Sequence, residues 1–128
     1  MKPINCKTIP HTEHRYPTVG DYWETPDTIE VRVSDMGDLR YETLVKVHEL
    51  VELALLKSRN VPLVITDDFD IQFEAERAQG KHGPDDEPGD DPRCPYRHEH
   101  RFAENIERQL AHEFGVNWDE YNTKLMAL

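Results

Sequence analysis

Cysteine is scarce in this 128-residue chain, and the two residues present, Cys6 and Cys94, form no C-x-x-C pair. Their wide separation argues against a disulfide-rich scaffold and favours a reducing compartment. No apolar run approaches the ~20 residues that a transmembrane helix needs. The opening residues, MKPINCKTIP, also lack the apolar centre of a signal peptide. We therefore expect a cytoplasmic protein with no membrane partner.

Basic residues are in deficit as well. The chain has 15 Lys and Arg against 26 Asp and Glu, which gives a formal net charge of −11. A phosphate backbone repels such a chain, so we expect no direct nucleic-acid binding. The acidic excess is consistent with ordinary solubility, with carboxylates gathered around cations, or with a surface that docks on a basic protein partner. The sequence contains no Gly-rich phosphate loop and no nucleophile elbow.

Hydropathy patterning predicts a single domain over residues 1–128, mainly α with a small β element, and therefore an α+β protein. Residues 1–27 contain four prolines and no long periodicity, which predicts an irregular N-terminal arm. Residues 29–33 alternate apolar and polar side chains as a half-buried strand does. About three helices are expected, at roughly 39–58, 67–79 and 96–114. Asp67 is the predicted cap of the second helix, and residues 80–95 are predicted to form a long acidic loop rich in Gly, Pro and Asp.

The helix predicted at 39–58 carries two polar residues where its pattern requires apolar ones. At 100° per residue, His48 and Glu52 fall inside the apolar arc. An unpartnered buried carboxylate costs several kcal/mol, so Glu52 needs a partner, and His48 lies one turn before it on the same face. The pair could present two ligands to one divalent ion, or could form only a hydrogen bond inside the core.

The helix predicted at 96–114 offers further ligands. His100, Glu104 and Glu107 form one stripe at the edge of an apolar face that includes Phe102 and Ile106. A stripe of His and Glu beside a core is what a second ligand set would look like. Nearby arginines could instead make this stripe a solvated edge.

Together these patterns predict a divalent-metal site. His48, Glu52 and His100 are the expected ligands, with Glu104 or Asp70 as supplementary ligands. We expect zinc in preference to magnesium or manganese. The oligomeric state is left open, and a homo-oligomer is compatible with the sequence.

The segment His48-Glu49-Leu-Val-Glu52 resembles the HExxH helix of zincin-type metallopeptidases, with Glu in place of the second His. The preceding strand and the apolar run around the motif are also similar to the way that small zincins enter this helix. The resemblance covers about 30 of the 128 residues. It implies that His48 and Glu52 bind zinc, that Glu49 is the general base, and that a third ligand comes from downstream, for which His100 is the candidate.

A second resemblance leads to a different enzyme class. Glu49-Leu-Val-Glu52 followed by Asp67-Asp-Phe-Asp70 is similar to the two acidic motifs of all-α NTP pyrophosphohydrolases. In that family, facing helices hold magnesium ions that bind a triphosphate. This chain departs from the pattern at Asp67, where the family has Glu, and at His48, where it also has Glu.

The whole chain is similar to small phage or prophage proteins that carry a VHELVE segment and a later PY…H helix, here Pro95-Tyr96 and His100. This resemblance implies no activity, but a phage-encoded chain would act in the host cytoplasm. Three functions therefore remain open. They are a small metal-binding hydrolase with an HExxE helix, an acidic non-enzymatic interaction or inhibitor protein, and a nucleotide pyrophosphohydrolase-like enzyme.

Overall fold

Strand β3 (Ile29–Ser34) is the centre of a three-stranded mixed sheet in the computed structural model, which describes residues 2–128. The Ile and Val side chains of β3 are buried and alternate with its two charged residues, as the sequence predicts. Strand β1 (Ile4–Ile9) pairs with β3 in parallel, and strand β2 (Gly20–Glu24) pairs with it in antiparallel orientation. The sheet order is β1-β3-β2, so β2 is an edge strand.

The prediction of an irregular arm over residues 1–27 is wrong. This segment contains β1, β2 and a short 3-10 helix, η1 (His11–Glu13). Its prolines all lie outside these elements, so they do not exclude strands. Most of β1 is exposed, which explains why it shows no apolar alternation. The Oγ of Ser34 on β3 hydrogen-bonds with the rings of His11 and His14, each at 2.8 Å, and fixes η1 to the sheet.

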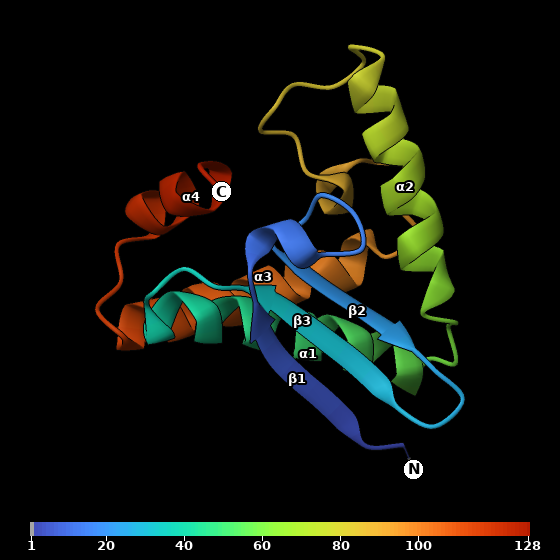
Figure 1. The fold of residues 1–128 in the computed structure, drawn as a ribbon, viewed down its shortest axis with the longest axis horizontal. Coiled ribbons are helices and arrows are strands. Elements are labelled where there is room, and N and C mark those ends of the chain that lie inside the picture. The colour runs from blue at the N-terminus through green and yellow to red at the C-terminus, as the bar shows by residue number, and fades with distance from the viewer. Residues whose placement is uncertain (1) are drawn as a thin grey trace.

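Helix α1 (Leu39–Ser58) has the predicted bounds and begins at Asp38, whose side chain accepts a hydrogen bond from the Arg40 N–H. It packs against β2 and β3, and helix α3 (Arg97–Glu113) packs along it. Figure 1 shows α1 and α3 side by side behind the sheet. Residues 52 positions apart in the sequence are therefore brought together between these two helices.

The prediction of three helices is wrong, because the described residues form four α-helices. The additional helix is α4 (Trp118–Met126), which Asn117 caps by accepting a hydrogen bond from the Glu120 N–H. Helix α2 (Val64–Ala78) begins before Asp67, so Asp67 is not its cap. Asp67 instead forms a bidentate ion pair with Arg15, a tertiary contact that local capping preferences do not predict.

Helix α3 is also turned away from its predicted orientation. Phe102, expected in the core, is 46% exposed. The buried face instead consists of residues at four-residue intervals, Glu99, Ala103, Glu107 and Ala111. Buried carboxylates are tolerated here because they are paired: Glu99 forms an ion pair with Arg59 at 3.0 Å, and Glu107 accepts a hydrogen bond from His48.

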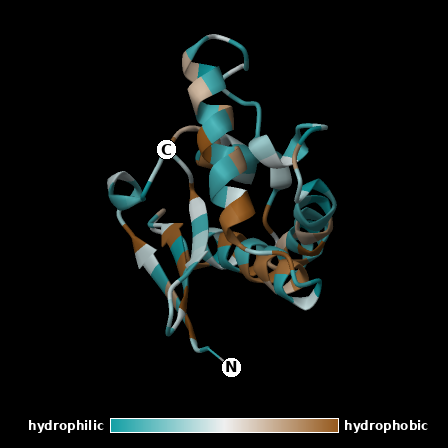
Figure 2. Ribbon diagram, turned by 90° about the vertical axis from the view of Figure 1, so that its right-hand side faces the viewer, coloured by the Kyte–Doolittle hydropathy of each residue, from teal (hydrophilic) through white to brown (hydrophobic). Residues whose placement is uncertain are grey.

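Apolar residues gather around the sheet and α1, whereas the end of α2 and the loop after it are mainly hydrophilic (Figure 2). Within residues 2–128, none of the helices combines the length and apolarity needed to cross a membrane. Of the seven polar or charged side chains buried among residues 2–128, four lie on α1 and α3: His48, Glu52, Glu99 and Glu107.

Candidate metal centre

Two helices bring together the residues that the sequence selected. His48 and Glu52 project from the same face of α1, one turn apart, and His100 projects from the first turn of α3. All three side chains are withdrawn from water: His48 is 8% exposed, Glu52 is 3% exposed, and the side chain of His100 is 12% exposed. These buried His and Glu groups could hold a metal ion.

The three inward-facing atoms form an equilateral triangle. His48 Nε2, Glu52 Oε2 and His100 Nδ1 are separated by 3.2 Å along each edge. Zinc ligands at ~2.0–2.1 Å in a tetrahedral arrangement are separated from one another by roughly 3.3 Å. The spacing therefore matches the ligands of a single ion and leaves one coordination position open.

The outer nitrogen of His48 is held by a carboxylate. Its Nδ1–H donates to Glu107 Oε1 at 2.8 Å, so a cation that displaced the proton on Nε2 would find a lone pair there. An imidazole–carboxylate pair of this kind orients a metal-binding histidine and increases its basicity. Glu107 is itself fixed, because its Oε2 accepts a hydrogen bond from Tyr121 of α4 at 2.6 Å.

The outer nitrogen of His100 faces the acidic loop. Its Nε2 lies 3.4 Å from Glu87 Oε2 and 3.8 Å from Asp90 Oδ1, which are ion-pair distances. This acidic environment favours a proton on Nε2, so a cation that displaced the proton on Nδ1 would find a lone pair there. The short 3-10 helix η2 (Pro88–Asp90) presses against the ring, and a Cβ atom added at Gly89 would lie 2.4 Å from it. Glycine is thus required at residue 89 for this contact.

Glu52 is oriented from the sheet side. Tyr22 on β2 donates to Glu52 Oε1 at 2.6 Å, and the Tyr22 hydroxyl also hydrogen-bonds with Thr66 of α2 at 2.8 Å. Glu52 Oε2 is thereby directed toward the two imidazoles. Each of the three candidate ligands thus has a further polar group that holds it in position.

The charges of the cluster are strongly coupled. Burial alone would raise the pKa of Glu52, but hydrogen bonds with His100 and His48 outweigh it and lower the pKa to about 2. Burial would lower the pKa of both imidazoles, but their carboxylate partners raise that of His100 to about 10 and that of His48 well above its ordinary value. The cluster therefore keeps Glu52 ionised and favours positive charge at its centre.

Glu49 lies beside this triangle without belonging to it. Its side chain packs against Gly20 at the start of β2, where a Cβ atom would come within 2.5 Å of the carboxylate. Burial and the negative charge of Glu52 raise the pKa of Glu49 to about 8. Glu49 and the three triangle residues line one cavity of about 230 Å³. A carboxylate in this position could exchange a proton with a molecule in the cavity.

The two expected supplementary ligands lie outside the triangle. Asp70 on α2 accepts hydrogen bonds from Tyr96 and Tyr16, and burial raises its pKa to about 7. Glu104 on α3 is half-buried and lines the same cavity as His100. Both carboxylates therefore border the cavity, but neither is among the atoms that converge in the triangle.

Sequence reasoning missed most of the residues that support the centre. Tyr22 belongs to the segment predicted to be irregular, and Glu87 belongs to the predicted acidic loop, for which the sequence indicates no role in the site. The sequence places Glu107 in the polar stripe as part of a possible second ligand set, but does not indicate that it is the partner of His48. The i, i+7 spacing of His100 and Glu107 could have indicated that both face α1.

No protein-family model matches the chain, and searches of curated proteins and of solved structures give no significant match. Any function must therefore be inferred from the arrangement of the residues themselves.

Proposed function

We propose that the chain is a metal-dependent hydrolase whose ion is zinc, bound by His48 Nε2, Glu52 Oε2 and His100 Nδ1. The observation that carries this proposal is the triangle of three inward-facing donor atoms, each pair 3.2 Å apart. Protonated imidazoles can donate to Glu52 along two edges of this triangle, but the third edge would then place two N–H donors 3.2 Å apart, an opposition that a single bound cation removes.

The donor set favours zinc over magnesium or manganese. Imidazole nitrogen is a common zinc ligand, whereas magnesium prefers oxygen ligands and retains several waters. Two His and one Glu, with a fourth position open, is also a ligand set of catalytic zinc sites. Structural zinc sites, by contrast, are normally closed by four protein ligands.

The cavity residues suggest how hydrolysis would occur. A bound zinc ion would polarise the substrate and lower the pKa of a water molecule. Glu49 would accept the proton of the attacking water and deliver it to the leaving group. With zinc bound, the lone pairs of His48 Nε2 and His100 Nδ1 would point at the ion. The protons would remain on the two outer nitrogens, which face Glu107 and Glu87. This division of roles agrees with the zincin resemblance of the HExxE segment.

Replacing Glu49 with Gln tests the catalytic part of the proposal. Glu49→Gln should retain stoichiometric zinc, because residue 49 is not in the triangle, and should lower the turnover of a peptide substrate by about a hundred-fold or more. Elemental analysis and a fluorogenic peptide assay on the same preparation would measure both effects. Unchanged turnover would remove Glu49 from the mechanism.

The pyrophosphohydrolase alternative receives less support. It requires Asp67 and Asp70 to face Glu49 and Glu52 around magnesium. Asp67 is instead paired with Arg15, and the two oxygens of Asp70 accept hydrogen bonds from Tyr16 and Tyr96. Weak magnesium affinity together with hydrolysis of a nucleoside triphosphate would restore this alternative.

A non-enzymatic interaction protein remains the other candidate, and its support is the net charge of −11. Binding to a basic partner that weakens with salt, in a protein without a bound metal, would favour it. In that case His48 and Glu52 would only stabilise the packing of α1 against α3.

A further inference from the structure

The outer ring nitrogen of His100 lies in a polar site that the triangle does not explain. This Nε2 is shielded from water and makes no hydrogen bond, although Glu87 Oε2 lies 3.4 Å away and Asp90 Oδ1 lies 3.8 Å away. A charged hydrogen bond from an imidazole to a carboxylate would be about 2.7–2.9 Å long. A buried ring nitrogen without a hydrogen bond is costly, so its presence beside two carboxylates calls for a reason.

The turn that contains η2 directs both carboxylates at this nitrogen. The Asp90 N–H donates to the carbonyl oxygen of Glu87 at 3.2 Å, which closes one turn of 3-10 helix. Side chains three residues apart eclipse one another in such a helix, so Glu87 and Asp90 lie on the same side. Gly89, between them, lets the backbone lie directly against the imidazole of His100. The segment from 87 to 90 thus presents two carboxylates to one ring nitrogen.

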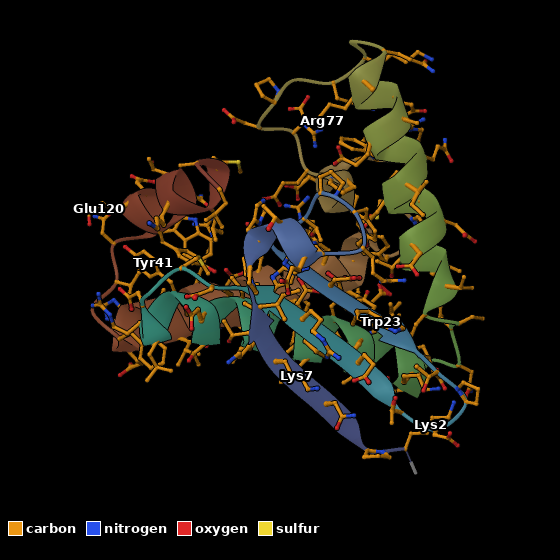
Figure 3. The ribbon with its side chains drawn as sticks, viewed as in Figure 1. Lys2, Lys7, Trp23, Tyr41, Arg77 and Glu120 are labelled. Atoms are coloured by element: carbon orange, nitrogen blue, oxygen red, sulfur yellow. The ribbon has the colours of Figure 1, made fainter. Side chains whose placement is uncertain are left out.

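The backbone of this turn is held from both sides. The guanidinium of Arg77 donates to the carbonyl oxygens of Gly83 and Asp86, just before the turn. Figure 3 shows Arg77 extending from α2 toward this loop. At the other end of the turn, Arg97 Nε donates to the carbonyl oxygen of Asp90 at 3.3 Å. The position of the turn therefore does not depend on its contact with the imidazole.

No Lys or Arg among residues 2–128 forms an ion pair with either carboxylate. Glu87 and Asp90 lie within ion-pair distance of the His100 ring alone, whereas Asp91, the next residue, is paired with Arg93 at 3.0 Å. Two carboxylates carry more negative charge than one imidazolium can offset. A divalent cation would balance it, and water could complete its coordination because the two side chains are 39% and 54% exposed.

The donor atoms also suit a metal ion in type and spacing. His100 Nε2 and one oxygen each of Glu87 and Asp90 all lie within 4.8 Å of one another. Neighbouring ligands of one zinc ion are separated by roughly 3.3 Å, so a small movement of the two exposed carboxylates would complete the arrangement. Imidazole nitrogen and carboxylate oxygen are both zinc ligands.

We propose that Glu87 Oε2, Asp90 Oδ1 and His100 Nε2 bind a second zinc ion, so that one imidazole bridges two ions. The second ion takes the place of the Nε2 proton, which passes to solvent, and the ring becomes an imidazolate. This ion goes beyond the proposed hydrolase function, with which it shares only His100. With zinc–nitrogen bonds of ~2.0–2.1 Å on opposite sides of the ring, the two ions would be about 6 Å apart.

This separation indicates what the second ion does. Paired catalytic ions that act on the same oxygen atoms are ~3.5–4 Å apart. The second ion is therefore too distant to share a water molecule with the first. It instead fastens the loop after α2 to α3, and it fixes the ring whose other nitrogen lies in the triangle.

Calorimetric titration with zinc tests the inference, on protein purified without a His-tag and stripped of metal. The wild type should bind two ions, and the second should bind more weakly and be lost on dialysis, because its carboxylates are partly exposed. Asp90→Asn should keep the tight ion and lose the weak one. The control Asp85→Asn removes one charge from an exposed position in the same loop and should bind both ions. An Asp90→Asn protein that binds as many ions as the wild type would overturn the inference.

Copper(II) tests whether the two ions share the imidazole. Copper binds sites of this kind at least as tightly as zinc, and two copper ions joined by an imidazolate are magnetically coupled. Wild-type protein with two equivalents of copper should therefore lose most of its electron paramagnetic resonance intensity at low temperature. Asp90→Asn with one equivalent should show the full signal of an isolated ion. Full intensity from two ions in the wild type would contradict a shared imidazole.

Glu52→Gln separates this inference from the proposed function, because Glu52 belongs to the triangle alone. Both proposals stand if Glu52→Gln loses the tight ion and Asp90→Asn loses the weak one. If the wild type binds a single ion that only Asp90→Asn loses, the triangle and the proposed function fail and the outer site stands. If only Glu52→Gln loses that single ion, the outer site fails and the proposed function is unaffected.

Discussion

At the scale of single residues, the centre depends on which nitrogen of each imidazole carries the proton. Glu107 holds the outer nitrogen of His48, and Tyr121 holds Glu107. This chain of hydrogen bonds keeps the Nδ1 proton of His48 on the outer side, so Nε2, which points at Glu52 and His100, is the nitrogen that would bind an ion. Residues that never touch the ion would therefore determine how well it binds.

Glu107→Gln is the most direct test of this dependence. The neutral amide is a weaker acceptor for His48 Nδ1–H, so zinc affinity should fall about ten- to a hundred-fold. Competition with a chromophoric chelator would measure the loss. The exposed Glu113→Gln on the same helix should bind zinc as the wild type does. If Glu107→Gln also binds zinc as the wild type does, Glu107 does not orient the ligand.

The sequence was most informative about residues on α1. His48 and Glu52 could be selected because they interrupt a long apolar arc, and a buried carboxylate needs a partner wherever the helix packs. The residues that support them could not be identified from the sequence in the same way. Tyr22, Glu87 and Tyr121 are common residue types at ordinary positions, and only the tertiary fold brings them to the centre.

At the scale of elements, α1 was predictable and the strands before it were not. Helix α1 has an Asp cap and twenty residues of consistent periodicity, all local signals. Strand β1 is an exposed edge strand with no alternation, and its pairing with β3 joins residues 25 positions apart, such as Ile4 and Ile29. Local patterns carry little information about pairing of that kind.

Helix α3 shows how tertiary contacts override an apolar pattern. Its sequence suggests that Phe102 faces the core, yet Phe102 is exposed and Glu107 is buried. The ion pair of Glu99 with Arg59 and the hydrogen bonds of Glu107 favour the observed rotation. The stripe predicted as an edge is therefore the face that meets α1.

The 3-10 helix η2 is expected to hold the imidazole ring of His100 in position. Gly89→Ala would place a Cβ atom 2.4 Å from the imidazole, so either the ring or the loop must move. We predict a fall in zinc affinity of about ten-fold, comparable to the loss of an orienting contact. Gly83→Ala in the same loop is the matched control, because its Cβ atom would meet Asp86 at an ordinary 3.4 Å.

Isothermal titration of zinc into both glycine variants would measure this effect. A normal affinity in Gly89→Ala, with a circular dichroism spectrum like that of the wild type, would show that the loop does not position the ring.

At the scale of the whole molecule, the centre joins residues from separate elements of the chain. His48 and Glu52 come from α1, His100 comes from α3, and their supporting residues come from β2, α4 and the loop after α2. A bound ion would link these elements in a protein whose apolar content is only 37%. It would also offset negative charge in a chain of net charge −11.

Metal content is the measurement that tests the central claim most directly. The protein should be purified without a His-tag, equilibrated with zinc, dialysed and analysed for elements, together with the variants His100→Ala and His112→Ala. His112 is an exposed histidine on the same helix and serves as the control. Stoichiometric zinc is expected in the wild type and in His112→Ala, and little zinc is expected in His100→Ala. A wild-type protein that retains no more zinc than His100→Ala would contradict it.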